Sequence, residues 1–254
     1  MNGLNQPQQA AVEHYGSPLL VLAGAGSGKT RTITEKIAWL IRHHDLKARQ
    51  IAAITFTNKS AREMKSRVGA LLSKDEARGL RVSTFHTLGL NIIRQEAAAL
   101  DFKPGFTILD GEDCAALLKE LSRKDNIEPD DDPGWRISRW KNAFILPEQA
   151  ISTAQDEREA WLARLYERYQ KHLRACNAVD FDDLIVLPAQ LLQRNRDIRE
   201  KWQSRIRYLL IDEYQDTNAS QYQLVKLLAG VEGRFTAVGD DDQSIYAWRG
   251  AQPE

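Results

Sequence analysis

Five short apolar runs punctuate the chain, and each is followed by small or polar residues. The runs are four to six residues long and consist mostly of Leu, Ile, Val and Ala. Continuous apolar strands that alternate with helices are typical of a parallel sheet covered on both faces. Ligands of such sheets bind at the carboxyl ends of the strands. We therefore predict five strands, at residues 19–23, 51–56, 80–84, 208–211 and 235–238.

Helical periodicity fills the gaps between these runs. A helix is predicted directly after Gly28, because apolar residues recur on one helical face at Ile33, Ile37, Leu40 and Ile41. A second helix is predicted at residues 157–176, with one apolar face formed by Leu162, Leu165, Tyr166, Tyr169 and Leu173.

The middle of the chain differs from its two ends. Between about residues 90 and 205 the pattern is helical and contains no convincing strand. The acidic stretch at residues 124–135 holds two prolines, which favours a surface loop. We expect an α/β domain with a parallel sheet, made of residues 1–90 and 205–254, and an inserted all-helical subdomain at residues 91–204.

Composition limits the class of protein. Of the 254 residues, 43% are hydrophobic and 28% are charged, which is typical of a globular chain with a sizeable core. The formal net charge is +0, so a nucleic-acid site would have to be a local patch. Cys114 and Cys176 match no metal spacing and suit a reducing compartment. Without a leader pattern or a long apolar stretch, we expect no membrane partner and a cytoplasmic protein.

The stretch "LLVLAGAGSGKTRTI" has the pattern of a phosphate-binding loop, in which an apolar strand leads into glycines and then a helix. Backbone amides of such a loop surround phosphate oxygens, and the helix N-terminus adds partial positive charge. Lys29 can reach the β- and γ-phosphates, and the Thr30 hydroxyl can bind Mg²⁺. The predicted nucleotide-binding residues are Ala23, Gly24, Ala25, Gly26, Ser27, Gly28, Lys29, Thr30 and Arg31.

A pair of acids follows the fourth apolar run, in "YLLIDEYQDTN". A carboxylate at the end of a neighbouring strand can hold Mg²⁺ through water, and an adjacent carboxylate can orient and deprotonate the attacking water. We assign the first role to Asp212 and the second to Glu213. The alternative is that both acids cap a helix N-terminus.

Several ordered motifs resemble those of the UvrD/Rep/PcrA helicases of superfamily one. They are "AGAGSGKT", "TFTNKSA", "STFHTL", "DEYQDTN" and "VGDDDQSIYAWRGA", together with "LNQPQQAAV" near the start and "VDFDDLI" at residues 179–185. The resemblance covers essentially the whole chain. Phosphate-binding loops usually begin with glycine, and the alanine at position 23 of this chain is normal for that family. It implies a RecA-like P-loop NTPase lobe, ATP and Mg²⁺ as cofactors, and Gln8 as a reader of adenine.

The same resemblance implies an ATP-dependent DNA helicase that moves 3′ to 5′ on single-stranded DNA. The expected partners are single-stranded DNA, 3′-tailed or forked duplexes, and a second RecA-like lobe that would follow residue 254. Because arginines of that second part are expected to act on the γ-phosphate, we predict weak nucleotide binding, very slow hydrolysis and no unwinding for this chain alone.

Candidate DNA contacts follow two strand ends. Thr57 and Asn58 open a helix and can bond phosphate, with Lys59 beside them, while Phe56 offers a ring to a base. After the next strand, the candidates are Thr84 and His86. A core role for Phe56, a structural role for His86 and a solvated helix face for Arg62, Lys65 and Arg67 stay open as alternatives.

The closing stretch "GDDDQSIYAWRGAQPE" combines carboxylates with aromatic residues. By resemblance, Gln243 contacts the γ-phosphate and water, Trp248 stacks on a base, and Tyr246 and Arg249 flank the DNA. Stacking on an aromatic ring contributes roughly 1–3 kcal/mol per base without regard to sequence. Asp240 and the two acids after it are predicted to be loop caps and hydrogen-bonders and not a metal cage.

Other interpretations are kept beside the helicase. The carboxylates of "DFDDL" could hold two metal ions as in nucleases, but we favour either capping by Asp180 or surface polarity. A P-loop kinase would leave Phe56, His86 and Trp248 unexplained. A nucleotide-gated single-strand binding module without catalysis would retain both predicted sites.

Overall fold

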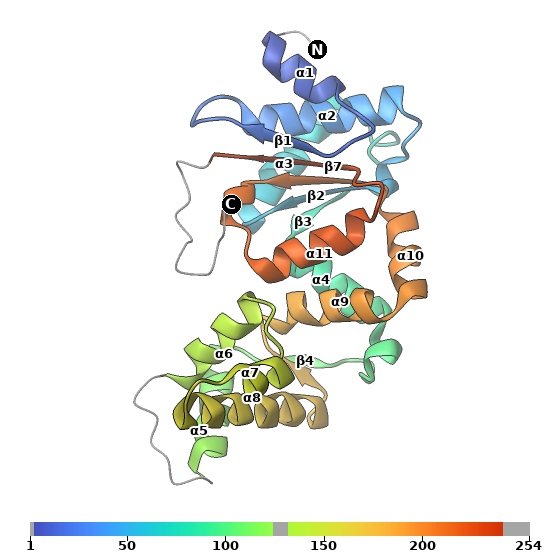
Figure 1. Ribbon diagram of the computed structural model, residues 1–254. Helices are drawn as coiled ribbons and strands as arrows, with labels where there is room; N and C mark the ends of the chain where they lie inside the picture. Colours follow the sequence, from blue (N-terminus) through green and yellow to red (C-terminus); the bar gives the residue numbers. More distant parts are fainter. Residues whose placement is uncertain (1–2, 124–131, 241–254) are drawn as a thin grey trace.

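The computed structural model describes residues 3–123 and 132–240 (Figure 1). Its main sheet is parallel throughout, with the strand order β1-β7-β6-β2-β3. The strands are β1 (Leu19–Leu22), β2 (Ile51–Thr55), β3 (Arg81–Thr84), β6 (Tyr208–Asp212) and β7 (Phe235–Gly239). All five predicted strands are confirmed, with ends shifted by one residue at most.

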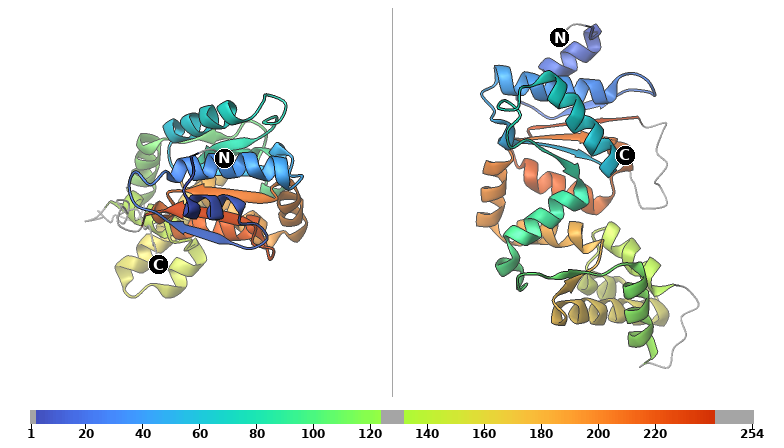
Figure 2. Two further views of the ribbon diagram at one scale, coloured as in Figure 1. Left: turned by 90° about the horizontal axis from the view of Figure 1, so that it is seen from above. Right: turned by 180° about the vertical axis from the view of Figure 1, so that it is seen from behind.

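Helices cover both faces of this sheet. One face carries α2 (Lys29–His43) and α3 (Asn58–Leu71), with α1 (Gln6–Glu13) packed on α2. The other face carries α4 (Phe85–Gln95), α9 (Asp183–Arg194) and α11 (Ala219–Ala229), with α10 (Arg196–Arg205) at the side (Figure 1). Short 3₁₀ turns lie at Ala48–Gln50, Ala97–Leu100 and Tyr214–Asp216. The views from above and from behind show the same three layers (Figure 2).

Successive side chains of each strand point to opposite faces of the sheet, so a strand inside the sheet packs against both helical layers. Ile51 and Ala53 of β2 pack with α2 and α3, whereas Ala52 and Ile54 pack with α4 and α9 on the opposite face. All five residues of β2 are buried, and the same holds for β6. A continuous apolar run is what a strand buried on both faces requires. The sequence pattern therefore reports the double layer directly.

A second group of helices packs apart from the sheet, around its own buried cluster (Figure 1). Its members are α5 (Gly111–Arg123), α6 (Pro133–Asn142), α7 (Pro147–Thr153) and α8 (Glu157–Ala175). The predicted helical face of residues 157–176 is confirmed, because its five apolar side chains are all buried. Within the described residues, no helix combines the length and the apolar character that crossing a bilayer requires.

Two expectations for the middle of the chain were wrong. β4 (Thr107–Ile108) and β5 (Ala178–Val179) form a short parallel pair where no strand was predicted. Strands of two residues are too short to show a periodic pattern. The predicted loop also ends early, because Pro133 begins α6 and the Asp132 carboxylate caps that helix. Residues 124–131 of that loop lie outside the described residues.

Candidate functional site

The carboxyl ends of the strands bring several predicted residues to one edge of the sheet. A cleft of about 300 Å³ lies there between the loops that follow β2 and β6 and the start of α2. It is lined by Thr30, Thr55, Phe56, Thr57, Ser60, Glu63, Asp212, Glu213, Gln215 and Asp216. Members of the predicted nucleotide, metal and DNA groups thus share one cleft.

The glycine-rich loop after β1 has a backbone that requires glycine. Gly26 and Gly28 have φ angles of +72° and +86°, which side chains disfavour. A Cβ at Gly28 would also lie 2.9 Å from Nε2 of Gln8. Gln8 is at the N-terminal end of α1, and its Nε2 donates to the Ser27 carbonyl at 2.7 Å. This contact places the predicted adenine reader directly on the loop, while its role toward adenine stays a prediction.

Lys29 begins α2 and points to two carboxylates. Its Nζ lies 3.5 Å from Glu213 Oε2 and 3.8 Å from Asp240 Oδ2. The Lys29 side chain is 9% exposed, and within the described residues its Nζ has no hydrogen-bond partner. Both carboxylates attract the ammonium, but they lie too far away to accept hydrogen bonds from it. Its three N–H donors are therefore available to a bound anion.

Asp212 ends β6 and is buried. Burial, and then the charge of Glu213, raise the pKa of the Asp212 carboxyl to about 6. Its Oδ1 has no hydrogen-bond partner among the described residues. A helix-cap role is not observed for the adjacent Glu213, whose side chain forms no capping bond, because Asn218 caps α11 instead.

Gln215 is a site residue that the sequence analysis missed. Its Nε2 donates to Glu213 Oε2 at 2.8 Å, and its Oε1 accepts from the backbone N–H of Asp240 at 3.1 Å. Gln215 is 2% exposed, and Gly239 has no room for a Cβ because of it. Glu213 also adopts a left-handed φ of +55°, which is uncommon for glutamate. The only sequence signal for Gln215 was its position just after the acid pair.

The ends of β6 and β7 are joined by these bonds, and this changes the interpretation of Asp240. It was predicted to cap or hydrogen-bond the loop, and its buried carboxylate also forms an ion pair with Lys29. The other predicted residues of the closing stretch, namely Gln243, Tyr246, Trp248 and Arg249, lie outside the described residues.

The predicted DNA contacts after β2 have mixed environments. Phe56 is half-buried and meets the Phe85 ring edge-on, with centroids 5.6 Å apart, which fits the alternative of a partial core role. Thr57 caps α3 by accepting from the Ser60 N–H at 3.0 Å, and Asn58 and Lys59 are exposed on its first turn. On the same helix Arg67 pairs with Glu63, as a solvated face would.

After β3, the two candidates differ in accessibility. Thr84 is buried, and its hydroxyl caps α4 by accepting from the Thr87 N–H at 3.2 Å. His86 stacks on the ring of Phe181, with centroids 3.9 Å apart and an interplanar angle of 20°. The sequence analysis did not name Phe181 as a DNA contact. In the structure Phe181 is 58% exposed. An exposed ring beside a candidate DNA contact makes Phe181 a further candidate.

The carboxylates that flank Phe181 are not surface groups. Asp180 does accept from the Asp183 N–H at 2.9 Å, as a cap would, but both side chains are buried. Of the two roles that were predicted, capping by Asp180 is therefore observed and surface polarity is not. Within residues 3–123 and 132–240, no three His, Cys, Asp or Glu side chains are grouped to hold a metal.

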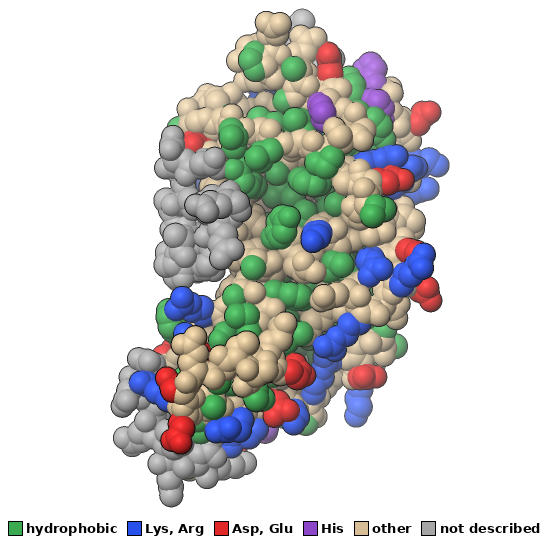
Figure 3. Space-filling model, in the orientation of Figure 1, with side chains coloured by type: hydrophobic (Ala, Val, Ile, Leu, Met, Phe, Trp, Pro, Cys, Tyr) green, Lys and Arg blue, Asp and Glu red, His purple; other side chains and the backbone are tan. Residues whose placement is uncertain are grey.

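Surface charge is mixed, in keeping with the neutral composition. On the face shown in Figure 3, Lys and Arg side chains are interspersed with Asp and Glu side chains instead of forming one continuous basic surface. Binding to a polyanion would have to rely on local contacts such as the helix start at Asn58 and Lys59.

Comparison with known proteins identifies a related family. The model of the "UvrD/REP helicase N-terminal domain" family matches residues 4–254. The chain is 59% identical to the "ATP-dependent DNA helicase Rep" of Escherichia coli K12 over 99% of its own length and 38% of that protein. It is 48% identical to Rep of Buchnera aphidicola from Acyrthosiphon pisum and 43% identical to the "ATP-dependent DNA helicase PcrA" of Leuconostoc citreum, covering 39% and 34% of them. The chain thus spans less than two fifths of these curated relatives.

Proposed function

The chain belongs to the UvrD/REP helicase N-terminal domain family, and on this premise we propose that it is the first motor lobe of an ATP-dependent DNA helicase. One observation carries the proposal for the site itself. The Lys29 ammonium lies 3.5 Å from Glu213, and Thr30 and Asp212 line the same cleft. A phosphate-binding loop and an acid pair in contact across a parallel sheet support nucleotide hydrolysis.

The nucleotide would bind through the loop that joins β1 to α2. Backbone amides of residues 24–28 would surround the phosphates, with the positive end of α2 behind them. Lys29 would exchange its two ion pairs for the β- and γ-phosphates. Gln8, already bonded to the loop at Ser27, would extend the site toward adenine.

The residues present fit a Mg²⁺ ion. Asp212 has a buried oxygen with no hydrogen-bond partner among the described residues, and the Thr30 hydroxyl lines the same cleft. These oxygens are hard ligands of the kind that Mg²⁺ prefers. Mg²⁺ bound there would neutralise charge that develops on the β- and γ-phosphates.

Glu213 would act on the attacking water. Before ATP binds, its carboxylate accepts from Gln215 on one side and pairs with Lys29 on the other, and the bond from Gln215 would remain once Lys29 turns to phosphate. It would accept the proton of a water aligned with the γ-phosphate. We propose that Gln243 contacts the same phosphate and so links it to Trp248.

Single-stranded DNA would cross the same edge of the sheet. The exposed start of α3 would bind phosphate, while His86 with Phe181 and, in our proposal, Tyr246, Trp248 and Arg249 would contact the bases and backbone. Movement in the 3′ to 5′ direction, and action on 3′-tailed or forked duplexes, are proposed by analogy with the family. They would require a second RecA-like lobe to close on the nucleotide.

The motor lobe is proposed to comprise residues 1–90 and 205–254, with residues 91–204 inserted. α9 and α10 precede residue 205 but share a core with the strands, which supports moving the second boundary back to the start of α9. The lone chain is proposed to bind nucleotide weakly, to hydrolyse it very slowly and not to unwind DNA.

Analysis of the reaction product tests this function. Free phosphate, formed only with intact Lys29 and Glu213, is expected from a hydrolase. Transfer of the γ-phosphate to a small molecule would contradict it and favour the P-loop kinase. Binding of both ATP and single strands without any phosphate release would favour the nucleotide-gated binding module.

A further inference from the structure

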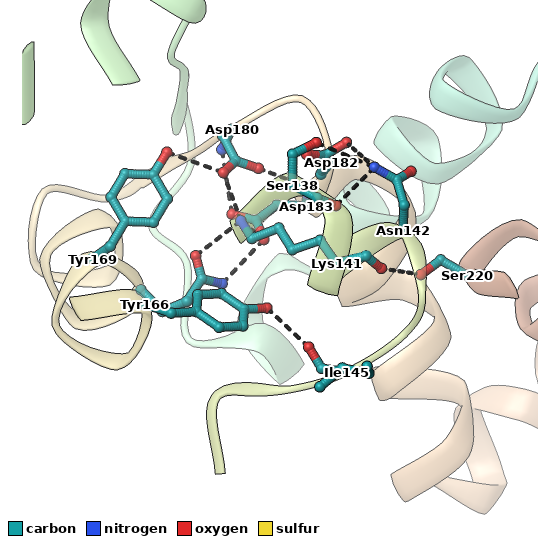
Figure 4. A network of polar contacts seen from close by, with 11 residues as sticks. Ser138, Lys141, Asn142, Ile145, Tyr166, Tyr169, Asp180, Asp182, Asp183 and Ser220 are labelled. Atoms are coloured by element: carbon teal, nitrogen blue, oxygen red, sulfur yellow. Dashed lines mark hydrogen bonds and ion pairs between the residues drawn. The ribbon is translucent and has the colours of Figure 1, made fainter. Parts of the chain in front are cut away.

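A wholly buried lysine, Lys141, contacts the segment that carries Phe181. Lys141, in the last turn of α6, donates from Nζ to Asp180 Oδ2 at 2.6 Å, to Asp183 Oδ1 at 2.8 Å and to Gln170 Oε1 at 3.0 Å (Figure 4). Tyr169 donates to the same oxygen of Asp180 at 3.0 Å. All three N–H donors of the ammonium therefore have acceptors, as a buried charge requires.

The carboxylates held by α6 lie on both sides of an exposed ring. Asp180 precedes Phe181, and Asp182 follows it, with Oδ1 accepting from Asn142 Nδ2 at 3.4 Å. Phe181 itself is 58% exposed, so burial does not fix its position. The anchored main chain on either side of it, together with the His86 ring, holds it at the proposed DNA edge.

The same end of α6 also grips the segment that follows the acid pair. Asn218 Nδ2 donates to Asn142 Oδ1 at 2.5 Å, and the Ser220 hydroxyl donates to the Lys141 carbonyl oxygen. Asn218 is the N-cap of α11, at the end of the short loop that begins with Asp212 and Glu213. The main chain from the acid pair to Asn218, and the contacts of Asn218 and Ser220 with α6, thus connect the proposed nucleotide acids to the segment that carries Phe181.

We propose that Lys141 and Asn142 are positioning residues that hold Phe181 in register with the Asp212–Glu213 loop, so that nucleotide binding is transmitted to the DNA contact through α6. This inference rests on the proposed function of the two sites. It adds a link through the inserted helices that is separate from the proposed Gln243–Trp248 link along the chain. Separating the buried ion pairs of Lys141 from Asp180 and Asp183 would cost much free energy. We therefore expect α6 and the segment that carries Phe181 to move together.

Asn218→Asp removes one of the two contacts between α6 and the start of α11, while the Ser220 bond to the Lys141 carbonyl oxygen remains. The substituted side chain keeps the oxygen that accepts the Gln221 N–H and caps α11, but it loses the N–H that binds Asn142. Lys141→Met removes the ion pair itself, although it leaves two carboxylates buried. The matched control is Lys171→Met on α8, whose ammonium is exposed and pairs with Glu167 at the surface.

The test follows the ¹⁹F resonance of 4-fluorophenylalanine introduced in place of Phe181, with AMP-PNP and Mg²⁺ as the probe. We expect nucleotide to shift the resonance in the otherwise unchanged chain and in the Lys171→Met control. In Asn218→Asp the shift is expected to fall by at least about threefold, while the Kd for AMP-PNP changes less than twofold and the thermal unfolding midpoint is retained.

A full shift in Asn218→Asp, or no shift in the unchanged chain despite bound AMP-PNP, would overturn the inference alone. Failure of the unchanged chain to bind AMP-PNP would overturn the proposed function as well. Single-strand affinity provides a second readout. Lys141→Met is expected to weaken binding of an oligo(dT) in the unchanged chain but not in a Phe181→Ala background, whereas equal losses in both would contradict positioning through Phe181.

Discussion

The ammonium of Lys29 lies 3.5 Å from the carboxylate of Glu213, so the loops that follow β1 and β6 meet through one ion pair. The pair joins the group proposed to bind phosphate to the group proposed to activate water. A bound γ-phosphate would compete with Glu213 for Lys29 and thereby release the carboxylate toward the water. In this account, the same event, replacement of Glu213 by phosphate at Lys29, both binds the nucleotide and frees the base for hydrolysis.

Replacing Lys29 by methionine removes the ammonium that is proposed to bind the β- and γ-phosphates. Lys29→Met is expected to raise the Kd for ATP about 10- to 100-fold, which corresponds to the ~1.5–3 kcal/mol of a charged hydrogen bond. Titration with a fluorescent ATP analogue measures this change. The exposed Lys171→Met serves as the control and should bind as the unchanged chain does. Equal affinity of the two variants would remove Lys29 from the site.

Glu213→Gln keeps the shape of the side chain but removes its charge. Hydrolysis is expected to fall roughly 10²–10⁴-fold, the usual contribution of a general base. Affinity for ATP should be retained or slightly increased, because a competitor for Lys29 is lost. Glu63→Gln is the control, since Glu63 lines the same cleft but pairs with Arg67. Unchanged phosphate release in Glu213→Gln would instead favour a binding module without catalysis.

The close approach at Gly239 predicts an effect on stability. A Cβ there would overlap Gln215 Oε1 and the Tyr214 ring, so Gly239→Ala is expected to lower the free energy of unfolding by ~1–3 kcal/mol. Gly69→Ala is the matched control, because its Cβ would meet nothing within 4 Å in the exposed part of α3. The control should be as stable as the unchanged chain or more so by up to ~1 kcal/mol. The free energies of unfolding are measured in denaturant. Equal values for Gly239→Ala and Gly69→Ala would contradict the close packing at Gly239.

Phe181→Ala tests the DNA contact that the sequence analysis missed. Loss of one stacked ring is expected to weaken single-strand binding by ~1–3 kcal/mol, with little dependence on base sequence. Fluorescence anisotropy with labelled oligonucleotides measures it. Tyr222→Ala removes a ring of similar exposure, 62%, from α11 and should bind normally. Identical affinities for the two variants would place the DNA elsewhere.

Lys36 predicts a dependence of stability on pH. Its Nζ donates to the carbonyls of Ala11 and His14, at 2.7 and 2.6 Å, at the end of α1. Burial lowers the pKa of Lys36 from 10.5 to about 8, so between these values the unfolded chain binds a proton that the folded chain has lost. The free energy of unfolding should therefore rise with pH across that window, by up to ~3 kcal/mol.

The comparison with Lys36→Met isolates this effect, because methionine does not titrate and all other groups are shared. The stability of the unchanged chain relative to the variant should increase between pH 8 and 10 and should be constant below pH 7. A difference that stayed constant over the whole range would show that Lys36 titrates normally in the folded chain.

The main sheet could be predicted from sequence because burial on both faces leaves a continuous apolar run, as in β2 and β6. The phosphate-binding loop was equally visible, since its glycines, Lys29 and Thr30 are adjacent in the chain. The pair β4 and β5 was not visible, because each strand has two residues and its partner is distant in sequence.

Contacts between distant segments account for the other misses. Gln215 matters only because β6 and β7 are neighbours, which places Asp240 beside it. Likewise, Asp180 and Asp183 are polar residues in a polar motif, and nothing local predicts that Lys141 lies between them in the core. The identity of a residue was readable from the chain, but its partner was not.

The central proposal is that this chain is the first motor lobe of a helicase whose ATP and DNA sites act together. The most direct measurement is the rate of phosphate release from ATP, with and without single-stranded DNA, for the 254-residue chain and for the same chain joined to a second RecA-like lobe. The account predicts that the lone chain hydrolyses ATP roughly 10³-fold or more slowly than the two-lobe protein, because the arginines that act on the γ-phosphate are expected from the second lobe. Equal rates for the two proteins, with the same stimulation by DNA, would contradict it.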